Sequence, residues 1–251
     1  MSDPAPGDGA VPPPPWERSP RRRASPARVP LTRERIVEAA YVVLDREGYD
    51  GLSMRQVAAE LGVAVSGLYA HVAGKDEVLR LMYERLFEGH ELPPPDPANW
   101  QEQVKDFARE GRRRLLLHRD MAKISMTHVP FTPELLVHVE SLLAIFRVAG
   151  LPDTVAAAAG DVLSTFMDGF VHEESMWDER RRDSKAETWE EMRATIKGYF
   201  DALPHERFPN IVALSGKLFD ESNDARFELA LDIILRGLAS YIPPGDAPPS
   251  R

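Results

Sequence analysis

Residues 52–79 read LSMRQVAAELGVAVSGLYAHVAGKDEVL, and this stretch decides the fold. Ser53 and Gln56 have the spacing of a capping box, in which each residue hydrogen-bonds the backbone of the other at the start of a helix. Gly62 supplies the stop for that helix. The segment VSGLYAHV follows after two residues and is long enough for a second, short helix. A capped helix, a glycine turn and a second short helix predict a helix-turn-helix.

The second helix of such a motif lies in the major groove of DNA. Ser66 and Gly67 are small enough to let the backbone approach DNA closely, and Arg55 can reach a base edge or a phosphate. Three further side chains are spaced to donate hydrogen bonds to phosphates: Tyr69, His71 and Lys75. Three apolar residues compete for the inward face, so one of them is expected to face outward: Val65, Leu68 and Val72.

Helical patterns flank the motif on both sides. Upstream, Thr32 has the position of an N-cap and Gly48 that of a helix stop, and apolar residues share one face between them: Ile36, Ala40 and Leu44. Downstream, apolar residues repeat every four positions: Val78, Met82 and Leu86. The motif is therefore expected to be part of a compact N-terminal domain of three helices with a connecting helix, spanning 31–92.

The first 30 residues are rich in proline and poor in apolar side chains, so we predict a disordered tail there, and a second one over 243–251. The first tail contains five arginines: Arg18, Arg21, Arg22, Arg23 and Arg28. Two interpretations of these arginines stay open. The tail is either simply solvated or an arm that touches the DNA backbone.

Prolines at positions 93, 94, 95 and 97 mark the predicted domain boundary. Beyond them, 93–242 is expected to form a larger helical domain, and no period-two alternation long enough for a sheet is present. Six helical stretches are predicted in this second domain, over 100–117, 121–127, 132–148, 153–177, 189–203 and 226–241. The predicted fold class is therefore all-α, with an N-terminal helix-turn-helix domain and a larger C-terminal helical domain.

Charge is distributed unevenly along the 251 residues. The net charge is −9, but residues 15–75 hold ten Lys or Arg against seven Asp or Glu, so the acidic excess lies elsewhere. The local field, rather than the total, attracts phosphate. There is no cysteine, which excludes disulfides and zinc sites built on sulfur. No apolar run reaches the ~18 residues of a membrane span, and the N-terminus lacks the layout of a secretory signal, so we expect a cytoplasmic protein.

Catalytic signatures are absent from the sequence. It contains no H-E-x-x-H, no G-x-S-x-G and no E-x-x-H pair. The run His172-Glu173-Glu174 could belong to a catalytic or metal cluster, but a solvated helix face is the simpler interpretation. We therefore do not expect an enzyme. Two alternatives stay open, a helical enzyme and a ligand-binding protein whose helix-turn-helix no longer binds DNA.

The quoted stretch, with its L-Y-x-H-V followed by a lysine, resembles the DNA-binding segment of the tetracycline-repressor (TetR) family. The similarity continues past the proline boundary. NWQEQVKDFAREGRRRLLLHRDMAK and RFELALDIILRGLASYI resemble the C-terminal domain of the tetracycline repressors themselves. The resemblance implies a transcriptional repressor that binds double-stranded operator DNA as a homodimer and releases it when a small organic effector binds the C-terminal domain.

The same resemblance implies the DNA contacts, residue by residue: Arg55, Val65, Ser66, Gly67, Tyr69, His71 and Lys75. Two departures concern the recognition helix. Ala64 stands where a polar cap is frequent, and Val65 stands where the tetracycline repressors hold a polar side chain that contacts bases. We therefore expect a different operator.

The effector pocket implied by the resemblance is lined by six residues: Phe107, Ser125, His128, Pro130, Phe166 and Glu173. Ser125 occupies the position of the family's metal-binding histidine, although His128 follows nearly one helical turn later. An alcohol binds divalent ions far more weakly than an imidazole does. We therefore expect an organic effector, with neither a metal nor a cofactor.

Two apolar stripes at helical spacing are candidates for a dimer interface. One comprises Val155, Ala159, Val162, Phe166 and Phe170, and the other Phe227, Ala230, Ile234, Leu238 and Tyr241. Periodicity alone is equally compatible with an intramolecular core. The resemblance favours a four-helix interface between two subunits.

Overall fold

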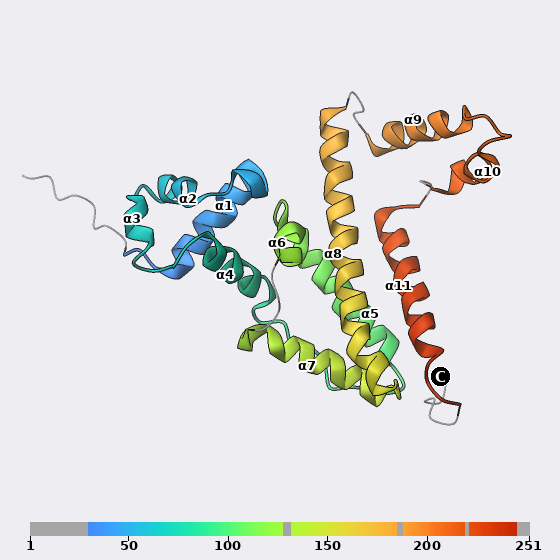
Figure 1. The fold of residues 1–251 in the computed structure, drawn as a ribbon, viewed down its shortest axis with the longest axis horizontal. Coiled ribbons are helices and arrows are strands. Elements are labelled where there is room, and N and C mark those ends of the chain that lie inside the picture. The colour runs from blue at the N-terminus through green and yellow to red at the C-terminus, as the bar shows by residue number, and fades with distance from the viewer. Residues whose placement is uncertain (1–29, 128–131, 185–187, 219–220, 245–251) are drawn as a thin grey trace, which may run out of the picture.

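The computed structural model describes residues 30–127, 132–184, 188–218 and 221–244, and every regular element in these ranges is a helix (Figure 1). The N-terminal elements are α1 (Arg33–Gly51), α2 (Met54–Leu61), α3 (Val65–Leu68) and α4 (Lys75–Phe87). The C-terminal elements are α5 (Trp100–Leu115), α6 (Met121–Thr127), α7 (Pro133–Val148), α8 (Asp153–Asp183), α9 (Trp189–Asp201), α10 (Pro209–Leu218) and α11 (Asn223–Ala239). The predicted all-α class is confirmed. Both predicted tails lie almost wholly outside the described residues.

The caps of the first helices are those that the sequence predicts. The Thr32 hydroxyl accepts a hydrogen bond from the Arg35 amide at 3.3 Å, and the Ser53 hydroxyl accepts one from the Gln56 amide at 3.3 Å. Gly48 has φ of 74° and ψ of 178°, which breaks the helical path of α1 before its last turn. Gly62 has φ of 65°, the left-handed conformation that glycine adopts without steric cost. Local sequence signals therefore fix the starts of α1 and α2 and the end of α2, whereas Gly48 breaks α1 without ending it, because α1 continues to Gly51.

Helices α1, α2 and α4 bury one apolar core on which α3 is seated. Its members are fully enclosed: Ile36, Val43, Leu44, Val57, Leu68, Val78 and Met82. Leu68 and Val72 are buried, while Val65 is partly buried and packs against the edge of this core, so Val65 is the least buried member of that trio. The Tyr41 hydroxyl donates to the Met82 carbonyl at 2.5 Å, which ties α1 to α4. The orientation of α3 therefore depends on α1 and α4.

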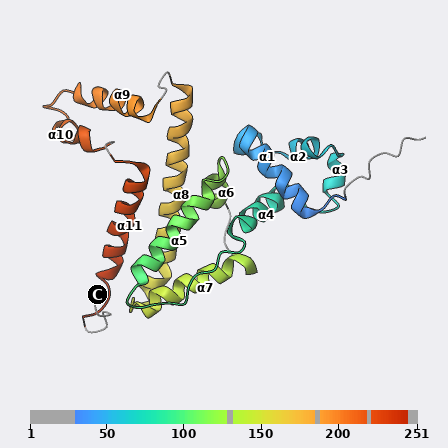
Figure 2. The ribbon, with the colours of Figure 1, turned by 180° about the vertical axis from the view of Figure 1, so that it is seen from behind.

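Helices α5, α7, α8 and α11 enclose a second core. Large side chains fill it, and they include Trp100, Ile145, Phe146, Phe170, Phe227 and Leu231. Both views show α8 as the long central helix, with α11 beside it and with α9 and α10 projecting as an arm from its far end (Figure 2). Residues from α7 and α8 also join the first core, among them Leu135, Met167 and Val171. The division of the chain at position 93 remains a prediction.

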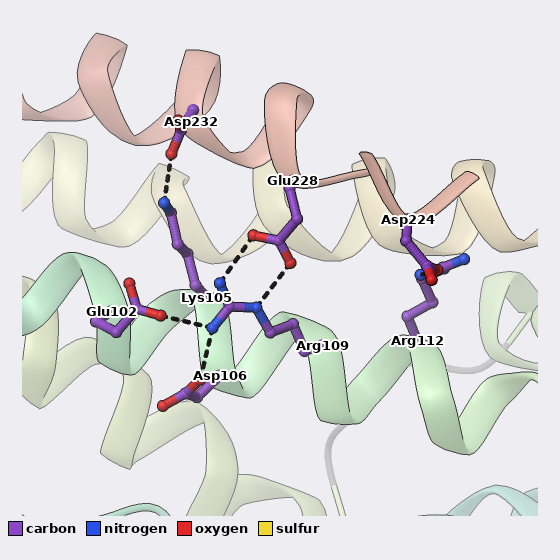
Figure 3. A network of polar contacts seen from close by, with 8 residues as sticks. All are labelled: Glu102, Lys105, Asp106, Arg109, Arg112, Asp224, Glu228 and Asp232. Carbon is purple, nitrogen blue, oxygen red and sulfur yellow. Dashed lines mark hydrogen bonds and ion pairs between the residues drawn. The ribbon is translucent and has the colours of Figure 1, made fainter. Parts of the chain in front are cut away.

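Ion pairs hold α11 against α5 (Figure 3). Arg109 donates from Nε and Nη2 to the two carboxylate oxygens of Glu228 at 2.7 and 2.8 Å. Its Nη1 also donates to Glu102 at 2.6 Å and to Asp106 at 2.8 Å. Lys105 pairs with Asp232 one turn further along α11. Partly exposed pairs contribute little free energy individually. Their effect here is to fix the rotation and axial position of α11, because the bidentate contact is directional.

Three predictions for the C-terminal domain are wrong. Helix α8 extends to Asp183 rather than ending near 177, and α10 has no counterpart among the predicted helices. Much of the two apolar stripes is intramolecular core rather than dimer interface: Ala159, Phe170 and Phe227 are buried within the chain. Of the first stripe Val162 is exposed, and α11 exposes Leu229 and Ile233, which do not belong to the second stripe.

Candidate DNA-binding surface and ligand cavity

The predicted DNA contacts fall into two groups. Arg55, Ser66 and Tyr69 are exposed, and Tyr69 has 55% of its surface free. Gly67 faces open space, since a Cβ added there would meet no atom within 4 Å. These four residues, at the start of α2 and along α3, form a surface that backbone phosphates and base edges could approach.

The other three predicted contacts are engaged within the protein. Val65 packs against the first core. The His71 carbonyl accepts a hydrogen bond from Arg33 Nε at 2.8 Å, although the imidazole itself has no such role. Lys75 places Nζ 3.4 Å from the Tyr49 carbonyl and 4.9 Å from the centroid of the Tyr49 ring. Lys75 therefore joins the start of α4 to the end of α1, whether or not it also contacts DNA.

Recognition helix α3 is short and weakly capped. It spans four residues, and Ala64 at its N-cap provides no side-chain hydrogen bond. Arg33, which is not among the predicted residues, supports the turn after α3 through the His71 carbonyl and pairs with Glu77 at 3.3 Å. Sequence reasoning could not find this contact because α1 and α3 meet only through tertiary packing.

A cavity of about 350 Å³ opens between α4, α5, α7 and α8. Apolar and aromatic side chains form most of its wall, including Tyr83, Phe87, Phe107, Leu142, Phe146 and Met167. Tyr83 and Phe87 belong to α4, the helix that follows the helix-turn-helix. A concave, largely apolar cavity of this size is typical of a small-molecule site.

The residues expected to line the effector pocket do not all meet at this cavity. Phe107 lines it. Ser125 is buried behind its wall, where its hydroxyl donates to Asp168 at 3.0 Å and also hydrogen-bonds Tyr83. His128 and Pro130 lie outside the described residues.

Phe166 and Glu173 lie on the α11 side of α8. The Phe166 ring stacks on Phe227 with centroids 5.4 Å apart. Glu173 accepts from Arg226 at 3.2 and 3.3 Å and from Trp177 Nε1 at 3.2 Å. Helix α8 thus presents Met167 to the cavity and Phe166 and Glu173 to α11. These two residues remain predictions as effector contacts, with their side chains placed elsewhere in this conformation.

Asp168 is a buried carboxylate on α8, next in sequence to Met167, which lines the cavity. Its Oδ2 accepts from Ser125, whereas Oδ1 has no hydrogen-bond partner among the described residues. Burial raises the pKa of Asp168 to about 6, and the hydrogen bond from Ser125 opposes that rise only in part. The Ser125 hydroxyl is committed to Asp168, and an alcohol is a poor ligand for a divalent ion. The residues at this position therefore do not fit the magnesium site of the tetracycline repressors.

Two histidines that sequence reasoning missed lie at the cavity. His138 of α7 lines it, and the ring of His90, just after α4, stacks on that of His138 with centroids 5.6 Å apart. Both ring nitrogens of His138 and Nε2 of His90 are shielded from solvent and lack a hydrogen-bond partner in the described part of the chain. Leaving such a group unpaired costs about 1–3 kcal/mol. The described residues supply no such partner, so the pair has room for one from outside this part of the chain.

In addition to α4, a set of polar and aromatic contacts near the start of α6 joins the two domains. Asp45 of α1 accepts from His118 Nδ1 at 2.9 Å through one oxygen and from the Arg119 amide at 2.9 Å through the other. The Tyr41 ring stacks on the His118 ring at 4.0 Å. The Tyr49 amide donates to Asp120 Oδ2 at 3.0 Å. Helix α1 is therefore connected to the C-terminal domain by directional contacts, independently of α4.

These features define a helix-turn-helix DNA-binding protein with a ligand cavity that shares a helix with its DNA-binding domain. Residues 36–82 match the family described as "Bacterial regulatory proteins, tetR family", and residues 92–242 match "Tetracyclin repressor-like, C-terminal domain". The chain belongs to the tetR family of bacterial transcriptional regulators. Members of this family bind operator DNA as dimers and respond to small molecules.

Known transcriptional regulators are similar to this protein along most of the chain. The transcriptional repressor DrrR1 of Streptomyces coeruleorubidus is 31% identical over 89% of this chain and 82% of its own length. An HTH-type transcriptional regulator of Saccharopolyspora erythraea is 32% identical over 84% of this chain and 85% of its own. The crystal structure of ActR from Streptomyces coelicolor in complex with actinorhodin has a TM-score of 0.74 and 41% identity, covering 84% of this chain and 97% of ActR. The chain is thus a DNA-binding repressor under small-molecule control.

None of the helices in the described ranges combines the length and the hydropathy that a membrane crossing requires.

Proposed function

We propose that this repressor releases its operator when a planar, mainly apolar aromatic molecule fills the cavity between α4, α5, α7 and α8. The observation that carries the proposal is that Tyr83 and Phe87 line this cavity while Lys75, on the same helix, contacts the end of α1. An occupant of the cavity therefore touches the element that orients the DNA-binding domain.

The mechanism is a shift between two states of the dimer. In the DNA-binding state the two α3 helices are about 34–36 Å apart, one turn of DNA. A ligand that packs against Tyr83 and Phe87 more favourably in another position of α4 shifts the population toward that state. The difference in ligand affinity between the two states sets the extent of release.

The chemical class of the effector follows from the wall of the cavity. Phe87, Phe107 and Phe146 offer ring faces and edges, which favour offset stacking or edge contacts with a flat aromatic ligand. ActR, a relative of similar fold, was crystallised with actinorhodin, which supports an organic effector here. We further propose that binding needs no metal, because Ser125 is paired with Asp168.

The proposal also includes a cytoplasmic location and the absence of catalysis. The tetR family consists of transcriptional regulators, and a regulator of this kind acts where the chromosome is. Within the described ranges no three His, Cys, Asp or Glu residues are grouped so that they could hold a metal ion. The helical enzyme remains the alternative class, and DNA binding separates the two.

The experiment is a band shift of the promoter DNA flanking the protein's own gene, with and without aromatic compounds. We expect a shifted complex that dissociates when an aromatic ligand is added, and a complex of Gly160→Phe that does not dissociate. Gly160 lines the cavity, and a Cβ added there would meet no atom within 4 Å, so a large side chain has room to fill the cavity. Failure of the wild-type protein to shift this DNA at low salt would contradict the proposal.

A further inference from the structure

We infer that His90 and His138 form the polar end of the cavity and bind an acidic oxygen, a carboxylate or an acidic phenol, of the aromatic effector. The inference rests on the proposed function, because it places the acidic group of that effector at one end of the same cavity.

The two imidazoles form one structural unit with the aromatic wall. Their rings lie at an interplanar angle of 23°, which is close to parallel stacking. The Phe87 ring meets His138 edge-on at 5.9 Å, and the Phe107 ring lies 6.1 Å from His90. Phe87, Phe107 and His138 all line the cavity. A flat ligand packed on Phe87 and Phe107 therefore brings its edge to the histidines.

Three of the four ring nitrogens of the pair have no hydrogen-bond partner among the described residues. His138 Nδ1, His138 Nε2 and His90 Nε2 have no partner in the ranges the structure describes and no contact with solvent. A neutral imidazole offers one N–H donor and one lone pair, and a protonated imidazole offers two donors. Apolar residues at these positions would pack without this cost. An oxygen ligand is the partner that uses these atoms.

The charges around the pair favour an anion. Burial, then the electrostatic effects of Arg114 and of the neighbouring His138 ring, lower the pKa of His90, while Glu110 acts in the opposite direction and Arg113 adds to the lowering. Glu110 is itself engaged by Arg113 at 2.7 Å and by Arg114 at 2.5 Å. An anionic oxygen placed against the rings supplies the missing counter-charge, and the imidazoles then take up protons.

The charged side chains of α1, α4 and α8 near the two histidines do not provide the anion that the rings lack. His138 also borders a surface groove between α1 and α4, whose charged members are Arg33, Glu34, Glu84, Arg85 and Glu88. None of these groups hydrogen-bonds His138 in the described part of the chain. On the α8 side, Asp161 lines the cavity as an exposed residue, and Asp168 is paired with Ser125. The rings therefore meet both cations and anions at their periphery and bind none of them.

The test uses the full-length protein and two probes of the same shape, 2-naphthoate and its neutral isostere 2-naphthamide. Binding is measured by isothermal titration calorimetry at pH 7.5 with EDTA present, in phosphate and in Tris buffer. We expect 2-naphthoate to bind at least about tenfold more tightly than the amide. The two buffers should reveal net proton uptake with the acid and none with the amide, because they differ in ionisation enthalpy.

The matched variants are His138→Phe, which keeps a ring at the cavity, and His205→Phe, which changes an exposed histidine between α9 and α10. His138→Phe should bring the two affinities within about twofold and abolish proton uptake, while His205→Phe should behave as the wild type does. Circular dichroism checks that each variant is folded. If His138→Phe does not fold, His90→Phe is expected to lose the same preference.

The outcomes separate the inference from the proposed function. Equal affinities for the two probes, or a preference that survives His138→Phe and His90→Phe, would overturn the inference. The proposed function would still stand in either case if Gly160→Phe abolishes binding of both probes. If neither probe binds at millimolar concentration, or if Gly160→Phe leaves binding unchanged, both the inference and the proposed site are wrong.

Discussion

The backbone amide of Tyr49 donates a hydrogen bond to Oδ2 of Asp120 at 3.0 Å. This contact connects the end of α1 to the residue that directly precedes α6. Asp120 holds a left-handed backbone, with φ of 55°, and its other oxygen pairs with Lys123 at 3.2 Å. Burial alone would raise the pKa of Asp120, but the hydrogen bond from Tyr49 and the charge of Lys123 outweigh it and lower the pKa. The carboxylate is thus held ionised at the junction of the two domains.

Replacing Asp120 by alanine should destabilise the folded protein by about 1–3 kcal/mol, because the partly buried Tyr49 amide loses its carboxylate acceptor and alanine is strained at positive φ. Urea unfolding at neutral pH measures the change. Asp50→Ala, at an exposed carboxylate beside Tyr49, is the control and should be nearly neutral. Equal effects of the two substitutions would show that the contact does not stabilise the junction.

Lys75 offers a prediction on the DNA side. If its ammonium contacts a phosphate in the complex, Lys75→Ala should weaken binding to all sequences and lower the slope of log affinity against log salt by roughly one. Competition band shifts between about 50 and 200 mM salt measure the slope. Lys217→Ala, on α10 of the other domain, should change neither quantity.

A different outcome for Lys75 has its own meaning. Lys75 Nζ lies 3.4 Å from the Tyr49 carbonyl in the free protein. If Lys75→Ala weakens DNA binding but leaves the salt slope unchanged, Lys75 acts by holding the end of α1 in place and does not contact a phosphate.

The helix-turn-helix could be predicted from sequence because its signals are local. The N-cap Ser53 accepts a hydrogen bond from the amide of Gln56, only three residues away. Gly62 ends α2 because its positive φ takes the backbone out of the helical conformation. Helix α10 gave no such signal. Its sequence, PNIVALSGKL, is short and carries a serine and a glycine within its second half, which weakens the helical pattern.

The cavity could be predicted only in part, because periodicity does not say which neighbour a helix face meets. Phe166 and Met167 are adjacent in sequence, yet one packs on Phe227 and the other lines the cavity. His90 and His138 come from segments far apart in the chain and meet only when α7 packs beside the end of α4. No pattern within either segment indicates that contact.

The exposed apolar residues of α11 predict where two subunits meet. Ile233 has 65% of its surface exposed in the single chain, and Leu229 has 59%. Placing an unpaired charge in a buried interface costs about 3–5 kcal/mol, so Ile233→Asp should yield a monomer in sedimentation experiments. Circular dichroism should show unchanged helicity, since Ile233 is not part of the intramolecular core, and operator affinity should fall with the loss of the dimer.

Val137→Asp is the matched control for the interface. Val137 is an equally exposed apolar residue, with 63% of its surface free, but it lies on α7. The Val137→Asp protein should remain dimeric. A dimeric Ile233→Asp protein would place the interface elsewhere, and a loss of helicity would assign Ile233 to the core.

Asp168 makes stability depend on pH in a defined direction. Its pKa in the folded protein is about 6, whereas an unfolded aspartate titrates near 3.9, so between these values the folded state binds more protons than the unfolded state does. The free energy of unfolding therefore falls as pH rises through this window and stays lower above it. The physical cause is the cost of ionising a carboxylate that is 8% exposed and has one unpaired oxygen.

Asp168→Asn removes the charge and keeps an oxygen that can accept from Ser125. We expect the variant to be more stable than the wild type by about 1–3 kcal/mol at pH 8, and the difference to vanish below about pH 4, where both proteins are neutral at this position. Urea unfolding at several pH values measures it. Asp161→Asn, an exposed carboxylate on the same helix, should change stability by less than about 0.5 kcal/mol at either pH. A destabilised Asp168→Asn protein at pH 8 would mean that the ionised carboxylate is paired in solution and that burial does not control its titration.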